Sequence, residues 1–229
     1  MAEDSYHDDI HSGATDRLRA LLGELTEKSR FRAEASPQQG EAGKTSLKAS
    51  LGDLIDGLDE RAYGMMLLLL ALPCTLPFIY LLPQIVALPM LALAGQLALG
   101  RPSPWLPKKL NQREFPIAVM QNTVERAAKY LGWFEKLAKP RLTALTDGKG
   151  GQIVGLLLLI PIASILVPLP LTNTTPGIGV AIAALGLIER DGLLILLGLA
   201  IGLLWVFLLV FFGAEAIYFV KDWLTARFG

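Results

Sequence analysis

The chain has 229 residues, of which 52% are hydrophobic and 18% charged, and its 21 basic and 21 acidic residues give a formal net charge of zero. A neutral, apolar chain does not suit nucleic-acid binding, which needs a basic surface. The single Cys74 excludes an internal disulfide and a cysteine metal cluster. Both histidines, His7 and His11, fall in the polar N-terminal segment. We therefore predict no metal site, no cofactor and no histidine-assisted catalysis in the apolar part.

The long apolar runs predict an all-α, polytopic integral membrane protein whose first partner is the lipid bilayer. Residues 1–44 are predicted to form a flexible polar tail with a short amphipathic helix over 15–25. The remaining residues, 45–229, are predicted to form the membrane domain. Its parts are a hairpin over 65–100, an amphipathic cytoplasmic segment over 101–150, a second hairpin over 151–188 and a final helix over 192–220. The acidic start lacks the basic region of a signal peptide, so the N-terminus is expected in the cytoplasm.

A second amphipathic helix is predicted to start at Ser46, just before the first hairpin. Its apolar stripe is Leu47, Leu51, Leu54, Ile55 and Leu58. Charged residues occupy the opposite face. We expect this helix to pack against the membrane domain from the cytoplasmic side.

The first hairpin consists of two apolar segments, residues 65–82 and 84–100, joined at Pro83. Each is close to the lower length limit for crossing a bilayer, so the hairpin either spans the membrane or re-enters it. In both cases the chain enters near Arg61 and returns near Arg101. The segments that flank this hairpin hold 18 of the 21 basic residues, and the positive-inside rule places them in the cytoplasm.

Residues 101–150 contain no spanning segment. The proline-rich stretch 101–107 is predicted to be an extended interfacial turn with Trp105 at headgroup level. An apolar stripe then recurs at helical spacing: Ile117, Met120, Val124, Ala127, Leu131 and Phe134. This stripe predicts an amphipathic helix that lies on the membrane surface or forms a lid under the membrane domain.

The second hairpin has apolar arms over 153–171 and 177–188, and a polar centre. That centre is Thr172, Asn173, Thr174 and Thr175, flanked by Pro170 and Pro176. One interpretation is an ordinary turn at the far surface. The other is a helix break held at membrane depth, where polar side chains satisfy the backbone or face a solute. The second arm extends only about 18 Å as a helix and cannot cross unaided.

The two hairpins share features that predict an internal repeat. A run of four leucines, 67–70 and 156–159, precedes prolines in both, and the six-residue spacing of Pro77 and Pro83 recurs at 170 and 176. Paired, proline-interrupted apolar segments are typical of transporter binding sites.

Three charged residues, Glu189, Arg190 and Asp191, separate the second hairpin from the final helix. They are interpreted as a cytoplasmic turn with Asp191 capping the next helix. The alternative makes them part of a solute or proton path. With residues 172–175, Gln96 and Arg101, these three complete the candidate polar site of the membrane domain.

A series of motifs carries a family resemblance. In chain order they are Arg61-Ala-Tyr-Gly64, Ala71-Leu-Pro73, Gly95-Gln96, Gly100-Arg101, Pro104-Trp-Leu-Pro107, Pro140-Arg-Leu142, Pro168-Leu-Pro170, Asn173, Pro176 and Ala184-Leu-Gly-Leu-Ile-Glu-Arg-Asp-Gly192. Together they resemble the ExoD family of bacterial exopolysaccharide-synthesis membrane proteins, over about residues 45–220. The resemblance implies a multi-pass protein of the bacterial inner membrane. It implies no particular reaction.

Two functions therefore remain open. The first is a transporter- or channel-like protein for a small solute, an ion or a lipid-linked intermediate. The second is a non-catalytic assembly or regulatory subunit of an exopolysaccharide machine, with exopolysaccharide-synthesis proteins as its partners. An enzyme is not predicted, because the sequence has no nucleotide loop and no nucleophile motif. The small residues of 177–186 permit close helix packing, including a homodimer.

Overall fold

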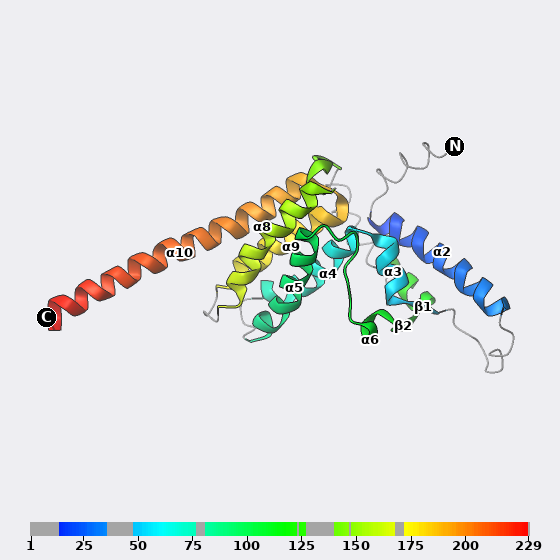
Figure 1. The fold of residues 1–229 in the computed structure, drawn as a ribbon, viewed down its shortest axis with the longest axis horizontal. Helices are drawn as coiled ribbons and strands as arrows, with labels where there is room; N and C mark the ends of the chain where they lie inside the picture. The colour runs from blue at the N-terminus through cyan, green and yellow to red at the C-terminus, as the bar shows by residue number, and fades with distance from the viewer. Residues whose placement is uncertain are drawn as a thin grey trace.

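The structure is a computed structural model that describes residues 14–35, 48–76, 81–122, 124–126, 140–146, 148–167 and 172–228. This part of the chain is mostly helical, which confirms the predicted helical class (Figure 1). The elements in order are α2 (Ala14–Ala35), β1 (Lys48–Ser50), α3 (Leu51–Leu58), α4 (Arg61–Ala71), η2 (Leu72–Thr75), α5 (Leu82–Ala98), α6 (Lys108–Asn111), β2 (Glu114–Pro116), η3 (Thr143–Leu145), α8 (Lys149–Ile165), α9 (Thr174–Glu189) and α10 (Gly192–Phe228). Residues 117–122 and 124–126 are also helical.

The N-terminal elements form a small module with its own apolar core. The module consists of α2, α3, the antiparallel pair β1–β2 and the helical residues after β2. Its buried side chains include Leu22, Ile55 and Ile117, which are 1%, 6% and 2% exposed. The apolar stripe predicted from Ile117 onward therefore packs against α2 and α3 in its first turns. The later stripe residues Ala127, Leu131 and Phe134 lie outside the described residues.

Helix α2 is longer than predicted, because it continues ten residues past position 25. Residues 26–35 are thus helical, and the prediction that they belong to a flexible tail is wrong. The hydroxyl of Thr26 donates to Leu22 O at 2.6 Å, and Ser29 donates to Leu25 O. Lys28 Nζ lies 3.6 Å from Asp53 Oδ1 of α3, which ties the extra turns to the module.

Helix α3 begins at Leu51 rather than near Ser46, since Ser50 is its N-cap. The backbone amide of Asp53 donates to Ser50 Oγ at 3.1 Å, and Ser50 Oγ donates to Asp53 Oδ2 at 2.7 Å. The residues before the cap are extended because they pair with β2, with Ser50 opposite Glu114. Three-residue strands carry too little alternation to be read from sequence.

Acid should weaken the module through this cap. The hydrogen bond from Ser50, helped by the charge of Lys28, lowers the pKa of Asp53 although partial burial opposes it. A carboxyl whose pKa is lower in the folded chain contributes stability above its unfolded pKa of about 3.9 and loses it as the pH falls through the folded pKa. Asp53→Asn should therefore flatten the acid side of the stability–pH curve, measured by thermal melting between pH 7 and pH 3. Ser50→Ala should do the same and cost about 1 kcal/mol at neutral pH. An unchanged curve in both variants would contradict this role of the cap.

The apolar segments form a helix bundle of α4, α5, α8, α9 and α10. Helices α4 and α8 each contact both α5 and α9, so the two hairpins pack into a four-helix ring, and α10 lies against α8 and α9. The core is closed by fully buried side chains, among them Leu67, Met90, Leu158 and Val180, all 0% exposed. The starts of α4 and α8 and the ends of α5 and α9 lie at one end of the bundle, here called the polar end.

Two glycines bring the hairpins together in the same way. A Cβ at Gly64 of α4 would lie 2.7 Å from Ala184 O and 3.0 Å from Ile188 N of α9. A Cβ at Gly155 of α8 would lie 2.9 Å from Ala94 O and 2.5 Å from Ala98 N of α5. In both cases the glycine faces a carbonyl oxygen and the amide four residues later on the opposing helix.

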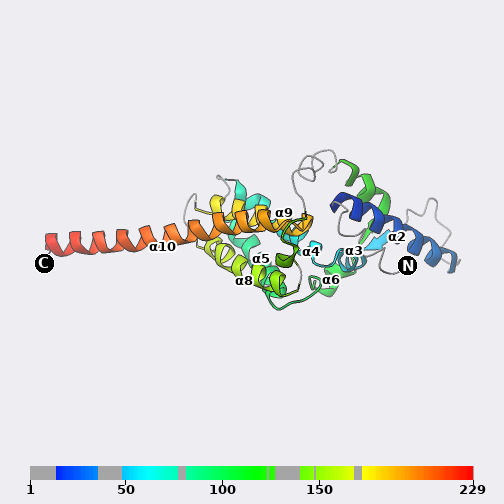
Figure 2. The same cartoon turned by 90° about the horizontal axis from the view of Figure 1, so that it is seen from above.

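Helix α10 starts at the polar end and runs past the hairpins. The indole Nε1 of Trp205 donates to Thr172 O at 3.0 Å, so Trp205 is level with the start of α9. Beyond that level α10 projects away from the bundle toward the C-terminus, on the side opposite the small module (Figures 1 and 2). Within the described chain, α10 is the helix long and apolar enough to cross a membrane, over Gly192–Gly213. Helices α5, α8 and α9 have 17, 17 and 16 residues.

Candidate functional site

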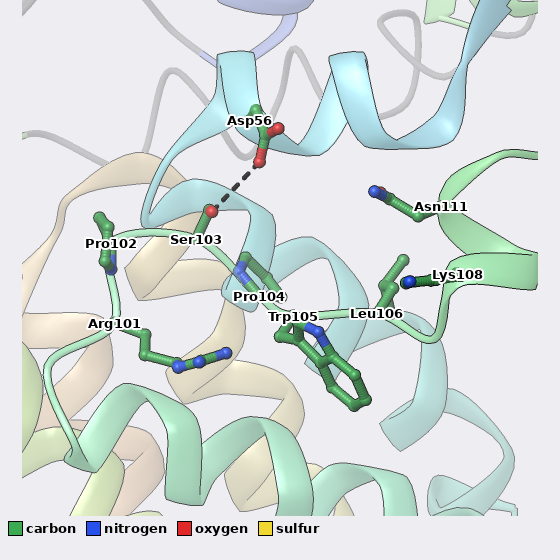
Figure 3. A pocket seen from close by; sticks show the side chains of 9 residues that line it. All are labelled: Asp56, Arg101, Pro102, Ser103, Pro104, Trp105, Leu106, Lys108 and Asn111. Atoms are coloured by element: carbon green, nitrogen blue, oxygen red, sulfur yellow. Dashed lines mark hydrogen bonds between the residues drawn. The ribbon is translucent and has the colours of Figure 1, made fainter.

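A pocket of about 500 Å³ lies between the bundle and the small module, at the polar end (Figure 3). It is built on the irregular segment that joins α5 to α6, which the sequence predicted as an interfacial turn. The lining residues are Asp56, Arg101, Pro102, Ser103, Pro104, Trp105, Leu106, Lys108 and Asn111. Its volume is in the range of small-molecule sites.

The wall of the pocket is fixed by hydrogen bonds to the bundle and to the small module. The hydroxyl of Tyr63, a fully buried residue of α4, donates to Ser103 O at 3.0 Å. Ser103 Oγ in turn donates to Asp56 Oδ1 of α3 at 3.2 Å, as Figure 3 shows. Because Pro102 and Pro104 restrict the backbone on each side, Ser103 is held in place. The pocket therefore has a defined shape although its side chains face water.

Gln96 of α5 holds the aromatic part of the pocket. Trp105 N donates to Gln96 Oε1 at 2.6 Å, and Gln96 Nε2 donates to Trp105 O at 3.4 Å. The side-chain amide thus replaces a backbone strand partner for Trp105. Trp105 remains 60% exposed, so much of the residue is accessible to a ligand. Gln96, which the sequence included in the candidate site, supports the pocket without lining it.

The charges in the pocket are two cations and one carboxylate. Arg101 and Lys108 come from opposite ends of the connecting segment, and Asp56 comes from α3 across the opening (Figure 3). All three are exposed. Arg101 was predicted as a site residue, whereas Asp56, Lys108 and Asn111 were missed. Asn111 lies against Gly52 of α3, where a Cβ would meet its Oδ1. No sequence signal predicts such a contact between Gly52 and Asn111, which are 59 positions apart.

The structure places residues 172–175 far from this pocket, at the opposite end of the bundle. Thr174 and Thr175 form the first turn of α9, and Asn173 directly precedes it. The side chain of Asn173 does not cap α9, and its Oδ1 is buried without a hydrogen-bond partner in the described part of the chain. Gln84 Oε1, near the start of α5, is likewise buried without a hydrogen-bond partner in the described part of the chain. Asn173 precedes the first turn of α9, and Gln84 lies in the first turn of α5.

The turn at 189–191 has a structural role. Arg190 adopts the left-handed conformation that ends α9, with φ of 54°. Leu193 N donates to Asp191 Oδ1 at 2.9 Å, which confirms Asp191 as the cap of α10. Asp191 is 3% exposed, and its backbone forms an isolated parallel β-bridge with that of Arg141, whose carbonyl accepts from Gly192 N at 2.7 Å. The predicted polar residues thus fall into three separate places.

In the residues that the structure describes, no group of three or more His, Cys, Asp or Glu side chains could hold a metal ion.

Comparison with known proteins identifies the family. The family model described as "Exopolysaccharide synthesis, ExoD" matches residues 37–211. The chain belongs to the ExoD family. This confirms the resemblance drawn from the motifs, and membership implies involvement in exopolysaccharide synthesis. The matched range includes every residue that lines the pocket.

Two relatives share extended similarity with this ExoD-family chain. It is 32% identical over 181 residues to an uncharacterized protein, slr1875, of Synechocystis sp. (strain ATCC 27184 / PCC 6803 / Kazusa), covering 74% of this chain and 84% of that one. It is 30% identical over 155 residues to Protein ExoD of Rhizobium meliloti (strain 1021), covering 64% of this chain and 62% of the relative. No solved structure matches the chain.

Proposed function

We propose that this ExoD-family protein is a multi-pass protein of the bacterial inner membrane that supports exopolysaccharide synthesis by handling a polar or lipid-linked intermediate at the cytoplasmic surface. The observation that carries the proposal is the pocket at the polar end of the bundle, which Arg101, Lys108 and Trp105 line. A cationic and aromatic site at the membrane surface suits an anionic intermediate that is attached to a lipid.

In the proposed arrangement the polar end faces the cytoplasm. The two hairpins enter the membrane from this side and return to it without crossing. At 1.5 Å per residue, Trp205 lies about 20 Å along α10 from Gly192, whereas a bilayer core is about 30 Å thick. Because Trp205 contacts the start of α9, the second hairpin would turn before the far surface. The matched contacts of Gly64 and Gly155 support a two-fold repeat in which both hairpins enter from the same side. The N-terminus would then be cytoplasmic and α10 would carry the C-terminus across.

A conduit through the bundle is less well supported than a surface role. The interior of the ring is filled by Leu67, Met90 and Leu158, and the helices approach closely at glycines. Movement of an intermediate would require the two hairpins to separate. We therefore place the working site at the pocket and not at the opposite end of the bundle, where the side-chain oxygens of Gln84 and Asn173 are buried without a hydrogen-bond partner in the described part of the chain.

The proposal predicts that exopolysaccharide output depends on the pocket cations. Arg101→Gln combined with Lys108→Gln should lower the polymer yield of cells at least fivefold, because no cation remains in the pocket to hold an anionic intermediate. The measurement is total polymer sugar per cell in a deletion strain that expresses each variant. Immunoblots of membranes check that each variant accumulates equally.

Lys109→Gln is the matched control. Lys109 is adjacent to Lys108 on α6 and equally exposed, but it does not line the pocket. It should leave the yield unchanged. Normal yield from the double variant would overturn the surface role and favour the alternative, a non-catalytic assembly subunit that works through the small module.

A further inference from the structure

We propose that the pocket binds a sugar phosphate, with the phosphate at Arg101 and Lys108 and the sugar ring on Trp105. This inference rests on the proposed function and names the chemical class that the same site would take. Each part of the pocket matches one part of such a ligand.

The phosphate end is set by the two cations. A guanidinium presents paired N–H donors that fit two phosphate oxygens, and an ammonium adds a point charge. Arg101 directly follows the Gly100 turn at the end of α5, where φ is +73°, and Lys108 starts α6. The chain between them is fixed at Ser103 and Trp105, so the two cations approach the opening from opposite sides (Figure 3).

The sugar end is set by the aromatic ring and by two polar groups. The indole of Trp105 offers a flat, electron-rich face that suits the C–H face of a sugar ring. Asp56 accepts hydrogen bonds, and the amide of Asn111 both donates and accepts, so together they match hydroxyl groups. These two side chains come from α3 and α6, and Figure 3 shows Asn111 beside Lys108 and Asp56 beside Ser103.

Asp56 also argues against a ligand that is only an anion. A bare phosphate would gain from two cations but would be repelled by this carboxylate, which already accepts from Ser103 Oγ. A ligand with hydroxyl groups next to its phosphate turns the same carboxylate into a partner. The pocket volume of about 500 Å³ leaves room for a sugar as well as a phosphate.

A sugar phosphate could reach this place on a lipid or as a soluble sugar nucleotide. Two exposed leucines lie close in sequence to the lining residues: Leu99 at the end of α5 is 82% exposed, and Leu110 on α6 is 45% exposed. Exposed leucines are expected near a site that touches the bilayer surface. The test below distinguishes the two sources.

The test uses the full-length chain in nanodiscs and isothermal titration calorimetry. Glucose 1-phosphate should bind at least tenfold more tightly than either inorganic phosphate or glucose. Trp105→Ala should remove this advantage of the sugar phosphate and leave phosphate binding unchanged, whereas Trp105→Phe should restore most of it. Arg101→Gln should weaken both phosphate ligands at least tenfold. Lys109→Gln should change nothing.

Competition then identifies the source. Displacement of glucose 1-phosphate by polyprenyl-phosphate glucose placed in the nanodisc, but not by UDP-glucose, would assign a lipid-linked ligand, and the reverse result a soluble one. Equal affinity for phosphate and glucose 1-phosphate, or no binding of either, would overturn the inference. If that result accompanies a loss of polymer in the Arg101/Lys108 double variant, the proposed function stands and only the ligand class is wrong.

Discussion

A single methyl group at Gly64 is expected to destabilise the bundle by about 1–3 kcal/mol or more, because overpacking forces helices apart. In Gly64→Ala the new Cβ would lie 2.7 Å from Ala184 O and 2.8 Å from the Ile188 side chain. A side chain can turn away, but the carbonyl belongs to the backbone of α9 and moves only with the helix. The measurement is the melting temperature of the purified protein in detergent, together with its yield in membranes.

Gly95→Ala provides the control for Gly64→Ala. Gly95 lies inside α5, and a Cβ there would meet nothing within 4 Å. Alanine is favoured over glycine inside a helix by about 1 kcal/mol, so this variant should be neutral or stabilising. Gly155→Ala should behave like Gly64→Ala, since its Cβ would meet Ala98 N and Ala94 O. Tolerance at one glycine and intolerance at the other would contradict the two-fold repeat proposed above.

The second large effect is expected in the small module. Leu22→Asp places an ionised carboxylate at a side chain that is 1% exposed, in the core that α2 shares with α3. Loss of the buried leucine alone costs about 2–5 kcal/mol, and a buried charge without a partner adds to it. We expect α2 to detach from α3 while the bundle stays folded. Hydrogen exchange of the α2 amides would then rise by orders of magnitude, with no change in α8.

Ala20→Asp is the matched control for Leu22→Asp, because Ala20 is an exposed residue of the same helix. It adds the same charge as Leu22→Asp and lowers the helix propensity by a similar amount. It should leave hydrogen exchange in α2 unaffected. Rapid exchange in both variants would show that α2 is disrupted by charge itself. Slow exchange in Leu22→Asp would mean that the core between α2 and α3 contributes little to stability.

Sequence patterns predicted the helices where one periodic signal dominated. The apolar runs predicted the helices α4, α5, α8 and α9 and the final helix α10, and Asp191 was correctly interpreted as the cap of α10. The start of α3 was missed because Ser46 and Ser50 are both suitable N-caps, and only pairing of residues 48–50 with β2 decides between them. The end of α2 was missed because polar residues such as Thr26 and Ser29 suit a linker as well as a helix.

The pocket was only partly predictable for a different reason. Arg101 and Trp105 stand out in the sequence because they follow an apolar segment. Asp56 and Asn111 do not, since they lie on short elements and reach the pocket only when α3 and α6 pack together. The residues that were grouped as one polar site are distributed between both ends of the bundle. Their grouping rested on residue type, and residue type does not specify which end of a helix a side chain occupies.

The length difference between α10 and the hairpins has a consequence for the membrane itself. In the arrangement proposed above, five helices occupy the leaflet next to the polar end, whereas α10 is the helix that continues past Trp205 toward Gly213, about 12 Å further. The described chain then takes up much more lateral area in one leaflet than in the other. A wedge of this kind relieves bending stress where the leaflet next to the polar end is stretched. The protein would therefore concentrate in membrane regions where this leaflet lies on the convex side, and it would stabilise that curvature.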